Sequence, residues 1–204
     1  MKSMSLIKAL FLVSTTTLLP LSTVYAEVQP RTLEIVEEVC KYCHGSEGEG
    51  SNAIYPRLAG QHKKYIVKQL TDFREKRRLG TMNEMAEKLT DTEISELADY
   101  FSAKPVLTHK VRNKDLAGVG KYIFTKGNPY SDLPACASCH GIAGAGTDSL
   151  PRLAGQHKRY LSSQLSEFNS RKRTNDNAIM HSIASKLTEL EREAVALYAS
   201  GLGK

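Results

Sequence analysis

The four cysteines of the 204-residue chain fall into two clusters, CKYCH at 40–44 and CASCH at 136–140. On a helical turn, cysteines three positions apart project from one face, so both thiols of a cluster can form thioethers with the vinyl groups of one porphyrin. The histidine that follows then lies beneath the ring, where its imidazole binds iron. The spacing therefore predicts two c-type haem sites: Cys40 and Cys43 with His44, and Cys136 and Cys139 with His140.

Two other uses of paired cysteines compete with this interpretation. A structural zinc site joins CxxC pairs that are roughly 15 to 20 residues apart. Here 92 residues separate Cys43 from Cys136. A thioredoxin-like redox pair expects a strand–helix–strand context that the sequence lacks. Because no cysteine lies outside the two clusters, none remains for a structural disulfide elsewhere.

An internal repeat surrounds the two clusters. Twelve of 18 positions are identical between PRLAGQHKKYIVKQLTDF, which begins at Pro56, and PRLAGQHKRYLSSQLSEF, which begins at Pro151. Each copy has a CxxCH cluster upstream and a methionine followed by KLT downstream. We therefore expect a first haem domain at 27–104 and a second at 115–204. Residues 105–114, which include a proline and three basic side chains but no acid, are expected to link them.

The sixth iron ligand separates electron carriers from haems that keep an open site for catalysis. After residue 26 the methionines are Met82, Met85 and Met180. When the KLT segments are aligned, Met82 falls opposite Met180, while Met85 falls opposite an isoleucine. A thioether is a soft ligand that suits haem iron and raises its reduction potential. Met82 and Met180 are therefore the expected distal ligands. Met85 is held in reserve, because the first copy is three residues shorter before its methionine.

Other polar residues recur in both copies and have expected supporting roles. The carbonyls of Pro56 and Pro151 are the expected acceptors for the second N–H of the proximal imidazoles. Residues expected either to bond haem propionates or to be solvated are Arg57, Arg152, Tyr65 and Tyr160. The basic runs 76–78 and 171–173 are expected to steer acidic partners or simply to face water.

The remaining histidines are alternative candidates for the sixth iron ligand. His62 and His157 match in the repeat, but each follows a proximal histidine by only 17 or 18 residues. We expect both near helix N-termini, facing solvent. His109 and His181 have no counterpart in the other copy and are expected to be structural or exposed.

The apolar periodicity is helical, and the predicted fold class is all-α. Positions at helical spacing include the sets Val36–Val39–Cys40–Cys43, Ile94–Leu97–Ala98–Phe101, Ile66–Leu70–Phe73 and Leu161–Leu165–Phe168. The last helix of each copy begins with a predicted capping box, Thr90 with Glu93 and Thr188 with Glu191.

Residues 1–26 have the form of a secretory signal peptide, with Lys2 and Lys8, an apolar run and expected cleavage after Ala26. An uncleaved membrane anchor is the alternative, but Pro20 interrupts an apolar run that is too short to span a bilayer. Removal of the signal leaves 26 basic and 22 acidic side chains, an excess that haem propionates would roughly cancel. We therefore expect an exported protein and no nucleic-acid partner.

These residues together resemble the dihaem cytochromes of the c4 type. The resemblance covers nearly the whole mature chain and rests on CKYCHG, CASCHG, both PRLAGQ segments, Met82 and Met180. It implies two tandem class I cytochrome c domains related by pseudo-twofold symmetry, with two covalent His/Met haems whose propionate edges approach each other at the domain interface. It also implies a periplasmic carrier between a cytochrome bc complex and a terminal haem-copper oxidase, often near the membrane surface. Asn128–Pro134 and the short Gly80–Thr81 segment depart from the repeat.

Three functions remain open at this point. An electron relay follows from methionines that fill both sixth positions, and it leaves no catalytic residue to assign. A dihaem enzyme, such as a peroxidase or a thiosulfate dehydrogenase, needs a displaceable ligand and a distal acid–base group, for which His181 is the candidate. A dedicated electron donor or acceptor of one dehydrogenase cannot be separated from a general relay by sequence. We expect a carrier and not an enzyme.

Overall fold

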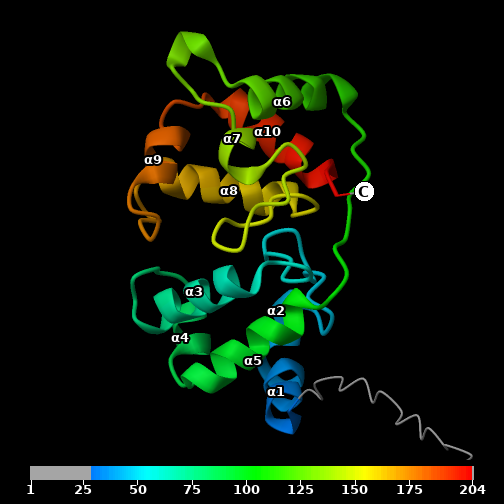
Figure 1. The fold of residues 1–204 in the computed structure, drawn as a ribbon, viewed down its shortest axis with the longest axis vertical. Helices are drawn as coiled ribbons and strands as arrows, with labels where there is room; N and C mark the ends of the chain where they lie inside the picture. Colours follow the sequence, from blue (N-terminus) through cyan, green and yellow to red (C-terminus); the bar gives the residue numbers. More distant parts are fainter. Residues whose placement is uncertain (1–28, 204) are drawn as a thin grey trace, which may run out of the picture.

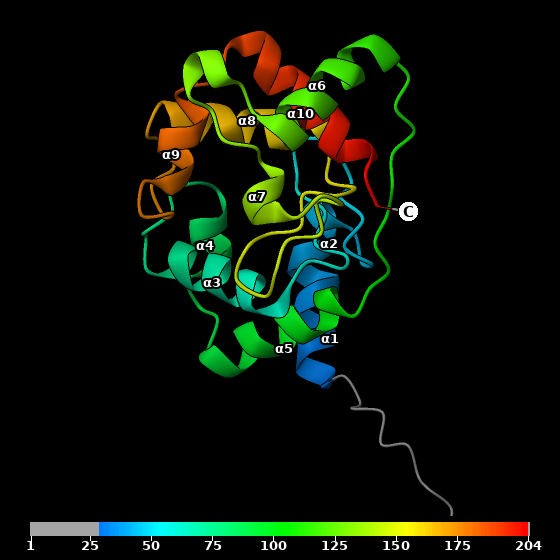
Figure 2. The same ribbon diagram turned by 45° about the horizontal axis from the view of Figure 1, so that its top comes forward.

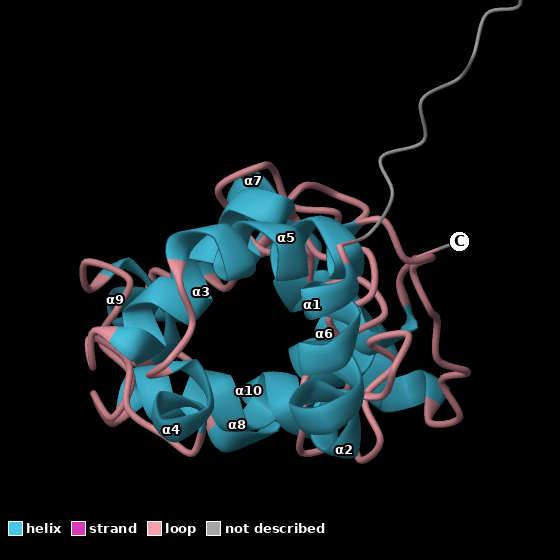
Figure 3. Cartoon of the chain, turned by 90° about the horizontal axis from the view of Figure 1, so that it is seen from below, coloured by secondary structure: helices cyan, strands magenta, loops and turns pink. Residues whose placement is uncertain are grey.

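The computed structural model describes residues 29–203, and the predicted signal peptide lies outside them. The first half contains α1 (Pro30–Ile35), the π-helical turn η1 (Val36–Cys40), α2 (Lys41–His44), α3 (Lys63–Arg74), α4 (Met82–Ala86) and α5 (Asp91–Ser102). The second half contains α6 (Lys114–Lys126), the 3-10 turn η2 (Pro129–Ser131), α7 (Ala137–His140), α8 (Lys158–Asn169), α9 (Ile179–Ala184) and α10 (Glu189–Gly201). Over these residues the chain forms helices and loops without named strands, which confirms the all-α prediction (Figure 3).

The two halves lie one above the other (Figure 1). A non-helical segment at 103–113 runs along one side between them, as Figure 2 also shows. Residues 105–113 of the predicted linker lie in this stretch, whereas its last residue, Lys114, begins α6. The exact domain limits stay a prediction. Among the described residues no helix is both long and apolar enough to cross a bilayer.

Both predicted capping boxes are present at the starts of the last helices. The hydroxyl of Thr90 accepts from the backbone N–H of Glu93, and the Glu93 carboxylate accepts from the Thr90 backbone N–H. Thr188 and Glu191 repeat this exchange at the start of α10. Each box satisfies N–H groups that a helix start leaves without partners, so short sequence signals fix where α5 and α10 begin.

The core of each half lies where its last helix packs on the others. In α5 the predicted apolar face is buried, with Ile94, Leu97, Ala98 and Phe101 each at most 2% exposed. Ile66 and Phe73 of α3 are buried as well, and the second half repeats the pattern with Leu161 and Phe168 of α8. The first cysteine of each cluster packs against these cores, Cys40 in the first half and Cys136 in the second.

The first and last helices of each half cross differently. In the second half a β-carbon at Gly120 of α6 would lie 2.0 Å from the carbonyl oxygen of Ala194 in α10, so the two helix backbones touch. In the first half the matching position is Thr32, which is fully buried and donates to the Glu96 carboxylate at 2.6 Å. Glycine therefore permits the helix backbones of the second half to cross in close contact, whereas a hydroxyl–carboxylate hydrogen bond joins the matching helices of the first half.

The helix that carries the first cluster departs from regular α geometry. The π-helical turn Val36–Cys40 inserts a wider turn between α1 and α2. As a result Val39 is 40% exposed while Val36 is fully buried, so the expected four-residue apolar face is only partly correct. Wide turns of this kind often accompany functional positions, and this one ends at the first cysteine of the cluster.

The two halves exchange equivalent contacts across their interface. The side-chain amide of Gln61 donates to the Arg152 carbonyl (3.0 Å) and accepts from the Arg152 backbone N–H (2.8 Å). Gln156 makes the same pair of bonds with Arg57, at 2.9 and 2.8 Å. Because each contact is repeated with the halves exchanged, the interface has pseudo-twofold symmetry.

One group of interface contacts has no symmetric copy. Asp72 is 3% exposed and accepts from Asn175 of the other half at 2.6 Å and from Arg77 at 2.8 Å, and it pairs with Lys68. Burial pushes the pKa of Asp72 upward, but hydrogen bonds from Lys68, Asn175 and Arg77 outweigh it and hold the pKa below its ordinary value. In the second copy of the repeat, Ser163 occupies the position of Lys68, so this charged contact stabilises only one side of the interface.

Candidate functional site

The two CxxCH clusters lie on matching short helices, and each ends in a glycine. In the first, α2 ends at His44 and Gly45 has φ +76°; in the second, α7 ends at His140 and Gly141 has φ +75°. A positive φ at these positions favours glycine and turns the chain away directly after the histidine. Cys40, Cys43 and Cys136 are half-buried and Cys139 is exposed, and all four thiols are free of disulfides.

The two proximal histidines are held in one orientation. Nδ1 of His44 lies 2.9 Å from the Pro56 carbonyl oxygen, and Nδ1 of His140 lies 3.1 Å from that of Pro151. A carbonyl can only accept, so each Nδ1 carries the proton and each Nε2 keeps a free lone pair for a metal. Burial lowers the pKa of both imidazoles, and the proline hydrogen bonds only partly oppose it, so both rings are neutral at pH 7. The expected contacts with Pro56 and Pro151 are confirmed.

The thiols do not have the electrostatics of a redox pair. Burial raises the pKa of the Cys40 thiol to about 11, and it is the main cause that raises the pKa of Cys136 to about 11 as well. Redox-active CxxC pairs instead depend on a lowered thiol pKa. Over residues 29–203 no three histidine, cysteine or carboxylate side chains converge as metal ligands.

Met85 lies in a more exposed environment than Met82 and Met180. Met82 begins α4 and is half-buried, whereas Met85 is 42% exposed. Met180 lies in α9 and is half-buried like Met82, and its backbone N–H donates to the Asp176 carboxylate at 2.5 Å. The environments of Met82 and Met180 are alike, which favours the repeat alignment over Met85. The ligation itself stays a prediction.

The residues that follow Met82 and Met180 in the chain have matched structural roles. The Asn83 side chain donates to the Phe73 carbonyl at 2.7 Å, and Nδ1 of His181 lies 2.9 Å from the Phe168 carbonyl. His181 therefore repeats the hydrogen bond of an asparagine, and it ties α9 to the end of α8. This explains His181 without a catalytic role.

The third residue of each basic run does not face water, contrary to the expectation. Arg78 is 8% exposed and Arg173 is 6% exposed, and both lie at the domain interface. The Arg78 guanidinium stacks on Phe73 of its own half at 4.6 Å, and that of Arg173 stacks on Phe168 at 4.5 Å. Stacking on a ring face holds a planar cation in place with little loss of side-chain freedom.

The two buried guanidinium groups share neutral acceptors. The Gln69 oxygen accepts from Arg78 at 2.7 Å and from Arg173 at 3.1 Å, and the Gln164 oxygen accepts from both at 2.6 and 2.8 Å. Arg78 also reaches the Tyr160 hydroxyl of the other half at 3.1 Å. Burial raises the pKa of Tyr160, but the two guanidinium charges outweigh it and lower that pKa below its ordinary value. Buried like charges with neutral partners favour an anion between them, which fits the propionates of two haems.

The repeated segment supplies further contacts across the interface. Arg57 and Arg152 bond backbone carbonyls across the interface, at 2.7 Å to Gly155 and 3.0 Å to Gly60, and thus hold the halves together. Tyr65 repeats the contact of Tyr160, since its hydroxyl accepts from Arg173 at 2.9 Å. Arg78, Arg173 and the two tyrosines therefore belong to the interface, a role that periodicity within one copy does not reveal.

The histidines at the starts of α3 and α8 do not face solvent as expected. Nε2 of His62 lies 2.7 Å from the Ala145 carbonyl of the other half. His157 is buried, and its Nδ1 lies 3.1 Å from Nε2 of His109 in the linker. Burial first, and then the charges of Arg57 and His157, lower the pKa of His109 to about 4. The linker is therefore fixed to the second half by a neutral histidine pair.

Two matching helical units, each with an oriented imidazole next to paired cysteines, define a duplicated c-type cytochrome. Residues 118–202 match the family model for cytochrome c, and residues 30–101 match the model for cytochrome C oxidase, cbb3-type, subunit III. The chain is 42% identical over 170 residues to cytochrome c4 of Thiocapsa roseopersicina, covering 81% of this chain and 88% of the relative. It belongs to the cytochrome c4 family of dihaem electron-transfer cytochromes.

Further comparisons agree with this family. The crystal structure of reduced recombinant cytochrome c4 from Pseudomonas stutzeri superimposes with a TM-score of 0.78 at 33% identity, covering 85% of this chain and 97% of that one. The thiosulfate dehydrogenase electron acceptor of Stutzerimonas stutzeri is 37% identical over 171 residues, covering 81% of this chain and 79% of the relative. Two tandem class I cytochrome c domains and two covalently bound c-type haems follow, as the sequence predicted.

Proposed function

We propose that this chain is a periplasmic electron relay whose two haems are each held between a histidine and a methionine. The attachment residues are Cys40, Cys43, Cys136 and Cys139, and the iron ligands are His44 with Met82 and His140 with Met180. The signal peptide is removed after Ala26, and the protein is a carrier with no catalytic role of its own. The observation that carries this proposal is the matched pair of neutral imidazoles fixed by Pro56 and Pro151.

A bound haem supplies a one-electron couple, and the residues of the chain set how it works. The proline carbonyls fix the imidazole tautomer and increase its electron donation to iron. A methionine in the sixth position leaves no open coordination site, so peroxide or substrate has no entry to the metal. Arg78 and Arg173 would hold the propionates in the buried interface and neutralise their charge.

The proposed partners are a cytochrome bc complex as donor and a terminal haem-copper oxidase as acceptor, with possible peripheral contact with the membrane. Their support is the membership of the cytochrome c4 family. A second candidate is the dedicated acceptor of a thiosulfate dehydrogenase, because two relatives are named thiosulfate dehydrogenase electron acceptors. Reduction of the purified protein by a thiosulfate dehydrogenase, compared with reduction by a bc complex, separates the two.

The test uses the mature protein and three methionine variants. Mass spectrometry is expected to show two porphyrins per chain, and the ferric protein is expected to show the weak far-red sulfur-to-iron band. Met82→Ala and Met180→Ala should each remove about half of this band and lower one reduction potential. The exposed Met85→Ala is the matched control and should leave both unchanged. Loss of the band in Met85→Ala, or retention in the other two, contradicts the assignment.

A further inference from the structure

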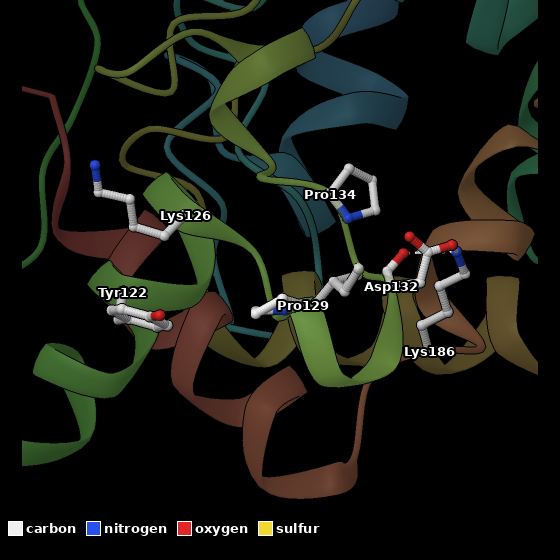
Figure 4. A pocket seen from close by; sticks show the side chains of 7 residues that line it. Tyr122, Lys126, Pro129, Asp132, Pro134 and Lys186 are labelled. Carbon is white, nitrogen blue, oxygen red and sulfur yellow. Dashed lines mark hydrogen bonds and ion pairs between the residues drawn. The ribbon is translucent and has the colours of Figure 1, made fainter.

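A groove beside the second haem motif is lined by a loop that the first copy of the repeat lacks. It has a volume of about 480 Å³ and lies between α6 and the loop that precedes Cys136. Figure 4 shows Tyr122 and Lys126 on one wall, Asp132 and Lys186 on the other, and Pro129 and Pro134 between them. The loop at 128–134 that forms its floor is the segment that the first copy of the repeat lacks.

The groove is preformed because the loop is anchored at both ends. The backbones of Asn128 and Leu133 exchange two hydrogen bonds, each 2.9 Å long. Leu133 is 3% exposed and packs with Ile123 and Leu187 in the core of the second half. A β-carbon at Gly127 would lie 2.1 Å from the Leu133 carbonyl oxygen, so this close turn requires glycine. A rigid groove loses little conformational entropy when a partner binds.

The rim of the groove is aromatic and basic. Tyr122 is 57% exposed and Tyr130, at the tip of the loop, is 99% exposed. Lys126 is exposed and forms no ion pair with another residue of 29–203. Lys186 pairs with Asp132 at 3.0 Å, but the Asp132 side chain is almost fully exposed, so a partner carboxylate can displace it at little cost. Tyrosine is enriched at protein interfaces, and the two lysines supply positive charge that an acidic partner complements.

The charge of the mature chain is divided between its halves. Residues 27–104 carry 12 basic and 14 acidic side chains, whereas residues 105–204 carry 14 basic and 8 acidic ones. The first half is thus slightly acidic and the second half strongly basic. A field of this kind draws acidic partners towards the second half and orients them as they approach.

We propose that this groove docks an acidic segment of a redox protein, so that electrons enter or leave through the second haem. The inference rests on the proposed function, since Pro134 lies two residues before the attachment residue Cys136. Carboxylates of the partner pair with Lys126 and Lys186, and an apolar part of the segment lies on Tyr122 and the two prolines. The first half lacks both the loop and the basic charge and therefore meets a different partner.

The test uses the reduced protein carrying both haems and a short polyglutamate peptide that contains one tyrosine. Peptide titration followed by NMR should shift the signals of Tyr122, Tyr130 and the loop, and the shifts should weaken with added salt. Lys126→Glu should weaken binding about fivefold to tenfold. Lys88→Glu is the matched control: it makes the same charge change at the position that repeats Lys186, in the half that lacks the loop, and it should change binding less than twofold.

A second variant keeps the result independent of folding. Asp132→Asn removes the carboxylate that competes for Lys186, and it should strengthen peptide binding two- to threefold without altering the far-red band. Equal weakening by Lys126→Glu and Lys88→Glu would overturn the inference, because binding would then follow net charge alone. Shifts that map to the basic runs or to the linker would overturn it as well. A protein with two haems and both far-red contributions that fails this test keeps the proposed function and loses only the docking site.

Discussion

Replacing Gly120 with alanine tests whether the close helix crossing supports the second haem domain. A β-carbon at this position would lie 2.0 Å from the Ala194 carbonyl oxygen and 2.5 Å from its carbon. Both contacts are with backbone, which cannot rotate away like the end of a flexible side chain. The helices α6 and α10 must therefore separate by more than an ångström to accept one methyl group.

The size of the effect follows from two opposing terms. Overpacking of a core contact costs about 1–3 kcal/mol, and a contact with backbone on both sides belongs at the upper end. Alanine in a helix is better than glycine by about 0.5–1 kcal/mol, which offsets part of the cost. We expect Gly120→Ala to destabilise the second domain by about 2 kcal/mol. Gly118, in the same helix, has no atom within 4 Å of its β-carbon position, so Gly118→Ala should stabilise the domain by about 0.5 kcal/mol.

The assay is urea unfolding of the protein with both haems, followed by helical circular dichroism and by the far-red band. The difference between the two alanine variants isolates the crossing, since both gain the same helix propensity. Gly120→Ala should lower the midpoint of the domain that contains Met180 and leave the first domain unchanged. If both variants unfolded at the same urea concentration, the reasoning from the backbone contact would be refuted.

Further predictions concern the interface and the linker. Asp72→Asn should lower the stability of the folded protein at pH 7. The pKa of Asp72 is depressed in the folded protein, so its ionised carboxylate contributes stability at pH values above the ordinary aspartate pKa of about 4. The variant lacks this contribution and should therefore lose less stability on acidification, measured by thermal unfolding from pH 3 to 7. The lowered pKa of His109 means that this imidazole is protonated less readily in the folded protein than in the unfolded chain. Protein stability should therefore rise between about pH 4 and 6.5 and level off above. If the stability of His109→Asn rose as steeply over this pH range, the reasoning would be contradicted. Arg78→Gln should leave both far-red contributions intact but lower the reduction potential of at least one haem, read by redox titration, and unchanged potentials would remove Arg78 from the propionate environment.

The motifs and the repeat were enough to predict the fold class and the haem chemistry. The CxxCH spacing needs only one helical turn, and the Thr90 and Thr188 boxes act within four residues, so neither depends on distant parts of the chain. Met82 and Met180 could be selected as the expected distal ligands because both copies of the repeat have a methionine at the same position. The fold class and the capping boxes could be read from one sequence because their signals are local, whereas the ligation by Met82 and Met180 stays a prediction.

The interface could not be predicted in the same way. Arg78 and His157 sit in polar surroundings along the chain, and a basic run or a histidine near a helix start is typical of solvent-exposed surface. Both are buried by distant parts of the chain: Arg78 contacts Tyr160, 82 positions away in the other half, and His157 contacts His109, 48 positions away in the linker. The π-helical turn at Val36–Cys40 escaped prediction for a different reason, since no residue type marks it.

The exchanged bonds of Gln61 and Gln156 have the pattern of a subunit interface. A contact in which each half gives what it receives is isologous, the arrangement that joins two identical subunits. The same surface would join two separate copies of one half as a symmetric dimer. Joining the halves in one chain raises the local concentration of one near the other and lets each differ from its partner: one half carries the loop at 128–134 and the other carries the buried Asp72.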